Sequence, residues 1–184
     1  MSIQARRERE RAEREKLIVT AARELAESEG WDAVTTRRLA EEVEYSQPVL
    51  YSHFKGKDAI MTAVAVEGFA DMAEELRDAA LSGIASIARA YTSFAERRPA
   101  LYDAMFSHAV DLPFASAAAP AALHAGFDTL ADALRPYAGD DDLGLLTETF
   151  WAALHGLVTL TRGARLPREA HDERLRILLS RFTG

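Results

Sequence analysis

The chain has 184 residues, of which 48% are hydrophobic and 28% charged, and its formal net charge is −7. This balance is typical of a soluble globular protein, long enough for one domain or for a small module joined to a larger one. The absence of cysteine excludes disulfides, thiolate metal sites and cysteine nucleophiles, and it suits a reducing compartment. Because the chain is acidic overall, any contact with nucleic acid has to be confined to a limited part of its surface.

The sequence contains no apolar run of about 18 residues, the length expected of a membrane span. Basic residues near the N-terminus are not followed by the apolar segment of a secretory signal. We therefore expect a cytoplasmic protein with no membrane association.

Residues 5–29 are predicted to be helical from their content of Ala, Glu, Arg and Leu. The segment 1–16 forms a charged arm with six Arg or Lys and four Glu, a net charge of +2, and it has almost no apolar stripe. From Leu17 onward apolar residues recur at helical spacing, which indicates one buried face. Gly30 is placed to end this helix.

Two short helices are predicted next. Thr35 or Thr36 can cap the first by accepting hydrogen bonds from free backbone N–H groups. Ser46 suits the N-cap of the second, and Pro48 is tolerated in its first turn. The segment 55–57 interrupts this helix, and a long apolar-rich helix follows from about Asp58 to Leu81.

The rest of the chain also has helical patterns. The predicted segments are 84–97, 100–109, about 119–138, 142–163 and 169–182, separated by glycine, proline and aspartate. No stretch shows the sustained alternation of a strand. The predicted fold is all-α with about nine helices.

The segment 30–57 has the size and turn spacing of a helix-turn-helix unit. It resembles the DNA-binding signature of the TetR (tetracycline-repressor) family over roughly residues 17–68. The matching residues are Gly30, Trp31, Thr35, Leu39, Ala40, Ser46, Leu50, Tyr51, His53, Phe54 and Lys57. The resemblance implies an N-terminal helix-turn-helix domain, 1–57, and a C-terminal effector-binding and dimerisation domain, 58–184.

Within this unit the apolar residues are expected to lock two crossed helices together, and the polar residues to meet DNA. The first turn of a recognition helix enters the major groove, which places Gln47, Pro48 and Val49 at base edges. Glutamine can read adenine, and valine can contact a thymine methyl group. Phosphate or groove-edge contacts are expected of Thr35, Thr36, Arg37, Ser46, Tyr51, Ser52, His53 and Lys57.

The turn departs from the family pattern at Glu44, where the family usually has glycine. Glycine relieves a backbone with positive φ, so Glu44 implies either strain or a differently shaped turn. Its carboxylate would also repel phosphate. The charged arm has two interpretations, contact with DNA or a solvated helix start, and its interleaved glutamates favour the second.

The sequence of the C-terminal two-thirds gives less specific signals than the helix-turn-helix segment does. Trp151, His155 and Gly156 resemble the Trp-x-x-x-His-Gly pattern of one TetR subgroup, and the first two share a helix face. They are equally compatible with ordinary core packing. An effector pocket is expected to be largely apolar with few polar anchors. The predicted lining residues are Tyr91, Phe94, Tyr102, Met105, Phe106, His108, Phe127, Trp151 and His155.

We expect neither a metal nor a cofactor. His124 with Asp128, and His108 with Asp111, are isolated pairs, and no metalloprotease motif, glycine-rich phosphate loop or nucleophile elbow is present. The sequence therefore does not predict an enzyme.

The resemblance implies a repressor that binds operator DNA as a symmetric dimer and is released by a small molecule. Few cations lie among the inner positions, which predicts an apolar or aromatic effector. The dimer is expected to use the last two helices, through Leu145, Leu146, Phe150, Leu154, Leu157, Val158, Leu175, Leu178, Leu179 and Phe182. The alternative function is a helical ligand-binding or enzymatic protein that does not bind DNA.

Overall fold

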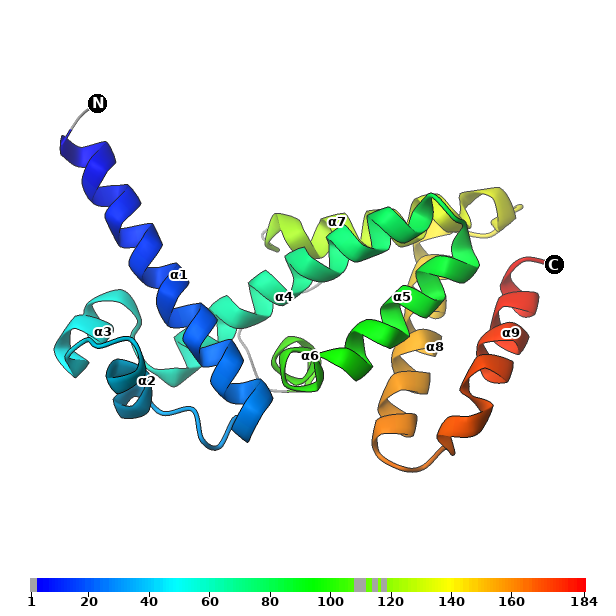
Figure 1. Ribbon diagram of the computed structural model, residues 1–184. Coiled ribbons are helices and arrows are strands. Elements are labelled where there is room, and N and C mark those ends of the chain that lie inside the picture. Colours follow the sequence, from blue (N-terminus) through cyan, green and yellow to red (C-terminus); the bar gives the residue numbers. More distant parts are fainter. Residues whose placement is uncertain (1–2, 108–111, 114–115, 117–118) are drawn as a thin grey trace. The chain divides into compact units, whose positions relative to one another are not determined.

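The computed structural model describes residues 3–107, 112, 113, 116 and 119–184. Over these ranges the chain forms α-helices and two short 3₁₀ helices and contains no strand, which confirms the predicted all-α fold (Figure 1). The helices are α1 Ile3–Glu29, α2 Thr36–Glu42, α3 Gln47–His53, α4 Lys57–Ala80, α5 Ile84–Arg97, α6 Pro99–Phe106, α7 Ala121–Leu134, α8 Leu143–Arg162 and α9 His171–Phe182. The 3₁₀ helices are η1 Arg135–Tyr137 and η2 Arg168–Ala170.

The chain divides into two compact units. The first unit consists of Met1–Gly68 and Arg98–Leu112, so it holds α1, α2, α3, the start of α4, and α6. The second consists of Phe69–Arg97 and Pro113–Gly184. The helix α6 thus packs with the N-terminal helices although α5 precedes it in the chain.

The core of the first unit is the apolar face of α1. Its buried residues begin at Ile18 and continue through Ala22 and Leu25 at helical spacing. They pack with Leu39 of α2 and Leu50 of α3, which are fully buried. Gly30 then ends α1 with a φ of +84°, a backbone conformation that glycine adopts without steric cost.

Within this unit α6 approaches α4 closely at Gly68. A Cβ at that position would lie 2.8 Å from both Leu101 Cδ1 and Met105 Sδ. A larger residue at position 68 would force the buried Leu101 and Met105 side chains to move, so glycine suits the close approach of α4 and α6.

The second unit is a bundle in which α5 contacts α7, α8 and α9. The last two helices run antiparallel (Figure 1), and the Phe150 and Phe182 rings meet edge to face at 5.1 Å between centroids. Phe150, Leu154, Val158 and Leu175 are buried within the protomer. The expectation that these four form a dimer face is therefore wrong, because they fill the core of the unit.

Two predicted helix ends need correction. The segment 119–138 forms α7 only to Leu134 and continues as η1, because Pro136 has no backbone N–H to donate to the α-helical ladder. The segment 100–109 forms α6, which ends at Phe106, and positions 108 and 109 lie outside the residues described.

One helix in the described ranges, α8, is long and apolar enough to cross a membrane by length and composition alone. Core helices of soluble proteins pass the same test. Only 22% of its apolar window is buried in the protomer. On the side of α8 that faces away from the core, Leu145 and Leu160 are exposed in the single chain.

Candidate nucleic-acid interface

The helix α2 begins at a side-chain cap, as its sequence predicts. The Thr35 backbone is extended, and its Oγ1 accepts a hydrogen bond from the backbone N–H of Arg38 at 3.2 Å. Arg37 lies on the exposed side of α2, where its Nε donates to Glu41 Oε1 at 3.0 Å. The first turn of α2 therefore presents Thr35 and Arg37 to solvent.

The turn between α2 and α3 carries the unusual residue Glu44, whose φ is +56°. The Glu44 N–H bonds to the Glu41 carbonyl at 3.2 Å, and the Tyr45 N–H bonds to the Ala40 carbonyl at 2.8 Å. This is the Schellman helix end, whose left-handed position normally holds glycine. Glu44 therefore accepts backbone strain in an otherwise ordinary helix-turn-helix turn.

The helix α3 has one buried residue, Leu50, which ties it to the core. Its first turn faces solvent: Gln47 and Pro48 are exposed, and Val49 keeps 38% of its surface accessible. Ser46 occupies the N-cap position, but its hydroxyl makes no capping hydrogen bond. The Ser52 hydroxyl donates to the Val49 carbonyl at 2.6 Å. The predicted base-reading residues thus lie together on one open turn.

Tyr51 joins the two short helices on their outer side. Its side chain is 50% exposed, and its hydroxyl lies 3.2 Å from Thr36 Oγ1 on α2. The pair forms a polar platform that can still bond to an external acceptor, because each hydroxyl can both donate and accept.

Two residues predicted to hold phosphates have internal partners. His53 Nδ1 lies 3.4 Å from Glu15 Oε1 on α1, and only 7% of the His53 side chain is exposed. The Lys57 ammonium donates a hydrogen bond to the Trp31 carbonyl. Both side chains therefore also fix the helices that frame α3.

An ion pair that the sequence did not indicate links the end of α1 to α2. Arg38 Nη1 donates to Glu29 Oε2 at 2.7 Å, and a second bond joins Nη2 to Oε1. The hydrogen bond from Arg38 lowers the pKa of the Glu29 carboxyl, and the bond to Glu29 raises the pKa of Arg38. The two residues are nine positions apart on different helices, so no periodicity signals their contact.

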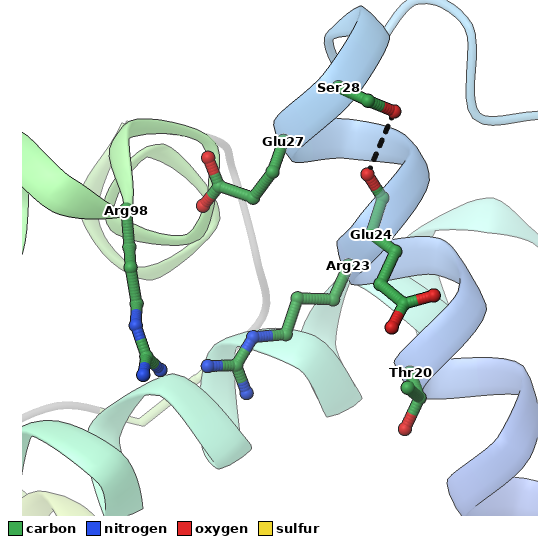
Figure 2. A pocket seen from close by; sticks show the side chains of 6 residues that line it. All are labelled: Thr20, Arg23, Glu24, Glu27, Ser28 and Arg98. Carbon is green, nitrogen blue, oxygen red and sulfur yellow. Dashed lines mark hydrogen bonds between the residues drawn. The ribbon is translucent and has the colours of Figure 1, made fainter.

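The helix α6 is held at its N-terminus by α1. The Glu27 carboxylate accepts hydrogen bonds from Ala100 N at 3.2 Å and Leu101 N at 2.9 Å, and Trp31 Nε1 donates to the Ala100 carbonyl at 2.8 Å. Figure 2 shows the Glu27 side chain turned toward α6, in a pocket that Arg23 and Arg98 also line. Glu27 thus caps a helix that lies more than seventy residues away in the chain.

The predicted effector-binding residues are divided between the two units. Tyr102 and Met105 are fully buried in the first unit, where the Tyr102 and Phe106 rings lie 4.7 Å apart. Tyr91, Phe94, Phe127, Trp151 and His155 belong to the second unit. His108 lies outside the residues described.

In the second unit Trp151 Nε1 donates to the Tyr91 hydroxyl at 3.0 Å, which ties α8 to α5. The Trp151 and His155 rings lie on the same side of α8, 6.2 Å apart. Burial lowers the pKa of His155, so its neutral form is favoured. The structure therefore joins three of the predicted residues, Tyr91, Trp151 and His155, in one cluster.

Within the described ranges, no group of three or more His, Asp or Glu side chains is arranged to hold a metal ion. His124 and Asp128 lie on the exposed side of α7.

The short capped helix α2, its tight turn and an α3 that exposes its first turn define a helix-turn-helix transcriptional regulator. The family follows from two matches. Residues 18–64 match the model described as "Bacterial regulatory proteins, tetR family", and residues 84–182 match "Tetracyclin repressor-like, C-terminal domain". The chain belongs to the TetR family.

Curated relatives match part of the chain. An uncharacterized HTH-type transcriptional regulator, YobS, from Bacillus subtilis is 34% identical over 95 residues, 49% of this chain and 50% of the relative. The class D tetracycline repressor protein from Escherichia coli is 46% identical over 50 residues, 27% of this chain and 23% of that protein. The chain thus spans about half the length of the first relative and less of the second.

Solved structures match nearly the whole chain. A protein of unknown function from Rhodococcus sp. RHA1 has a TM-score of 0.75 at 25% identity, covering 91% of this chain and 92% of that one. FadR from Thermus thermophilus, a TetR-family repressor in complex with lauroyl-CoA, has a TM-score of 0.63 at 20% identity, with 91% and 92% covered. The second likeness shows the fold alone.

Proposed function

We propose that the chain is a repressor that binds an operator as a symmetric dimer, reads the DNA with residues 1–57, and senses an effector with residues 58–184. The observation that carries this proposal is the open first turn of α3, where Leu50 is buried while Gln47, Pro48 and Val49 face solvent. One such helix reads only a few base pairs, so a dimer on two half-sites is needed for specificity.

The remaining exposed residues suit phosphate contacts. Thr35, Thr36, Arg37, Ser46, Tyr51 and Ser52 surround α3 with hydroxyl and guanidinium groups that fix register on the duplex without reading sequence. His53 ends α3 and Lys57 begins α4. Each can reach a phosphate only while sharing its internal partner, Glu15 for His53 and Trp31 for Lys57.

The test is footprinting of the purified protein on the DNA that flanks its own gene. We expect protection of a two-fold symmetric site whose half-sites lie about one helical turn, or a multiple of it, apart. Binding should weaken steeply with added salt. Absence of sequence-preferring binding in every salt and effector condition would favour the alternative, a helical ligand-binding or enzymatic protein without DNA function.

Two variants on α3 separate base reading from phosphate contact. Gln47→Ala should relax preference at one base pair of each half-site and cost about 1–3 kcal/mol on the best operator. Tyr51→Ala should weaken binding to all sequences alike and leave the salt dependence unchanged, because no charge is lost. Both are measured by fluorescence anisotropy on an operator and its single-base variants. If Gln47→Ala weakens every sequence equally, Gln47 does not read a base.

We assign the dimer interface to α8 and α9. Helical geometry turns the chain by about 100° per residue, so Leu145, Ala152, Gly156 and Leu160 lie on α8 opposite its buried stripe. Leu145 is 64% exposed and Leu160 40%. A Cβ added at Gly156 would meet no described atom within 4 Å, so packing within the protomer does not require glycine there. A close helix-to-helix contact with a second copy would use both the exposed leucines and the small residues.

The effector is proposed to be a mostly apolar or aromatic small molecule bound by the second unit, with His155 as a polar anchor. The cluster of Tyr91, Trp151 and His155 offers aromatic surface, and the neutral imidazole that burial favours can accept a hydrogen bond. We further propose that the chain catalyses no reaction and acts in the cytoplasm.

A thermal-shift screen of small molecules tests the effector, with each hit retested for release of operator DNA. Apolar or aromatic compounds should stabilise the protein and release the DNA, and Trp151→Ala should abolish both effects. The proposal is wrong if only nucleotides or other polyanions do so.

A further inference from the structure

The helix α1 continues far beyond the core that it helps to build. Its buried residues begin at Ile18, and none of residues 3–17 is buried, yet the helix is regular from Ile3 (Figure 1). Side-chain pairs four residues apart stabilise this projecting part: Gln4 with Glu8, Arg6 with Glu10, and Arg11 with Glu15. Apolar burial therefore does not explain the length of the helix.

The projecting part carries three arginines on one face. Arg7, Arg11 and Arg14 follow the spacing i, i+4 and i+7, which places them within an arc of about 60° around the helix. Ile18, Ala22 and Leu25 continue the same line and are buried. The apolar stripe of α1 thus becomes an arginine stripe where the helix leaves the core, and we call Arg7, Arg11 and Arg14 the basic stripe.

The side that the basic stripe faces is fixed by its neighbour Glu15. Glu15 meets His53 at the C-terminal end of α3, so this side of α1 is the side of the recognition helix. Because α1 and α3 belong to the same compact unit, their relative placement is defined. With a rise of about 1.5 Å per residue, Arg7 lies about 12 Å beyond the contact with α3.

Charge pairing leaves the basic stripe cationic. Arg11 uses its Nε on Glu15 and keeps four further N–H donors. Within the part of the chain that the structure describes, no ion pair engages Arg7 or Arg14. All three side chains are exposed. The opposite face of the helix carries Arg9, Glu13 and Lys16. Arg9 and Lys16 are seven residues apart, as Arg7 and Arg14 are.

We infer that the basic stripe is a second DNA-contacting surface, which binds backbone phosphates flanking the half-site that α3 reads. This inference rests on the proposed operator binding. It favours DNA contact by the charged arm, the interpretation that the interleaved glutamates alone did not favour, because the arginines share one face on the side of α3. Arginines at 7, 11 and 14 match a phosphate backbone because guanidinium groups donate several hydrogen bonds to phosphate oxygens without reading sequence. Phosphate contacts would then flank α3 on both sides, from α2 on one side and from the basic stripe on the other.

The test compares two double variants that remove equal charge at equal spacing. Arg7→Ala with Arg14→Ala changes the basic stripe, and Arg9→Ala with Lys16→Ala changes the opposite face. Alanine favours helix, and neither variant removes the pairs Arg6 with Glu10 or Arg11 with Glu15. Circular dichroism verifies that both proteins keep their helix content.

The readout is the salt dependence of binding to a long duplex that contains the operator and its flanks. Each lost phosphate contact lowers the slope of log K against log salt by about 0.9, so the stripe variant should lose about 1.8 per protomer, or about 3.6 per dimer. Raising salt from about 50 to 150 mM should then weaken the wild-type protein about 50-fold more than the stripe variant. The opposite-face variant should keep the wild-type slope, and Arg7→Lys with Arg14→Lys should largely restore it.

Trimming the flanks of the duplex gives an independent measurement. A duplex cut back to the two half-sites should lower the wild-type slope at least as far as that of the stripe variant. It should lower the slope of the stripe variant much less, because only Arg11 of the basic stripe remains in that protein. Equal slopes for the two double variants, or no effect of trimming, would overturn the inference while operator binding stands. If the wild-type protein shows no sequence preference at all, the proposed function fails, and the same slopes measured on unrelated duplexes still decide whether the stripe binds DNA.

Discussion

At the scale of single residues, Glu44 combines backbone strain with an unfavourable charge. Its φ of +56° lies in a region that costs a non-glycine residue about 1 kcal/mol or more. Its exposed carboxylate stands in the turn that leads into α3. Glu44→Gly should therefore raise the free energy of unfolding by about 1 kcal/mol, and it should also tighten DNA binding. Chemical denaturation and anisotropy measure the two effects.

The chain offers a control for each effect. Ala164 has a φ of +54° in a helix end of the same type, where Ala164 N bonds to Thr161 O and Arg165 N to Leu160 O. Ala164→Gly should give a similar gain in stability with no change in DNA affinity. Glu44→Ala keeps the strained backbone and removes the charge, so it should change affinity alone. A loss of stability in Glu44→Gly would show that the turn carries no strain.

His155 gives stability a pH dependence whose sign follows from its environment. Burial lowers its pKa below 6.5, so the unfolded chain takes up a proton at a higher pH than the folded chain does. The contribution of neutral His155 to the free energy of unfolding is fully present above the pKa of the unfolded state. It is lost as the pH falls toward the lower pKa of the folded state. His155→Gln should therefore flatten the fall in unfolding free energy between about pH 7.5 and 5.5. An unchanged slope in His155→Gln would contradict the assignment.

At the scale of helices, α6 depends on a cap supplied by α1. Glu27 accepts hydrogen bonds from two backbone N–H groups of its first turn, Ala100 and Leu101, which have no partner within the helix. Glu27→Ala should cost about 1–2 kcal/mol of unfolding free energy, as loss of a good N-cap does. Glu24→Ala, one turn earlier on α1, should cost less than about 0.5 kcal/mol, because Glu24 is exposed and the Ser28 hydroxyl bonds to its backbone carbonyl, which the substitution keeps. Similar losses in both variants would mean that the cap is not formed in solution.

The sequence predicts the helices well because their ends depend on local chemistry. Thr35 accepts from a backbone N–H three residues on, Gly30 adopts a positive φ, and Pro99 starts α6. The all-α fold and the helix-turn-helix unit follow from such signals together with helical spacing.

Contacts between distant residues were not predictable in this way. His53 with Glu15, Lys57 with Trp31, and Glu27 with α6 join positions 26 to 74 residues apart, and periodicity within one segment carries no information about them. The basic stripe is different, because its spacing is present in the sequence. The spacing does not show which side of α1 faces α3, and the contact between Glu15 and His53 supplies that information.

At the scale of the whole molecule, the decisive feature is the apolar surface that α8 leaves uncovered. This helix is apolar enough to pass a test of length and composition for a membrane span, and Leu145, Leu160 and, on α9, Ile177 are exposed in the single chain. In the proposed dimer, a second copy would cover these exposed side chains. A substitution on this exposed side of α8 should therefore weaken dimer assembly more than it weakens folding of the protomer.

Leu145→Arg is expected to convert the protein into a folded monomer. The substitution places a charge within the proposed contact, where burial without a partner costs several kcal/mol. It leaves the protomer intact because Leu145 is already 64% exposed. Sedimentation at micromolar concentration should show half the wild-type mass, circular dichroism should show unchanged helix content, and operator affinity should fall by more than 100-fold because one protomer reads only one half-site. The control is Leu81→Arg, which adds the same charge at a leucine that is 90% exposed after α4. A Leu145→Arg protein that remained dimeric, or a Leu81→Arg protein that dissociated equally, would place the two-fold contact elsewhere on the molecule.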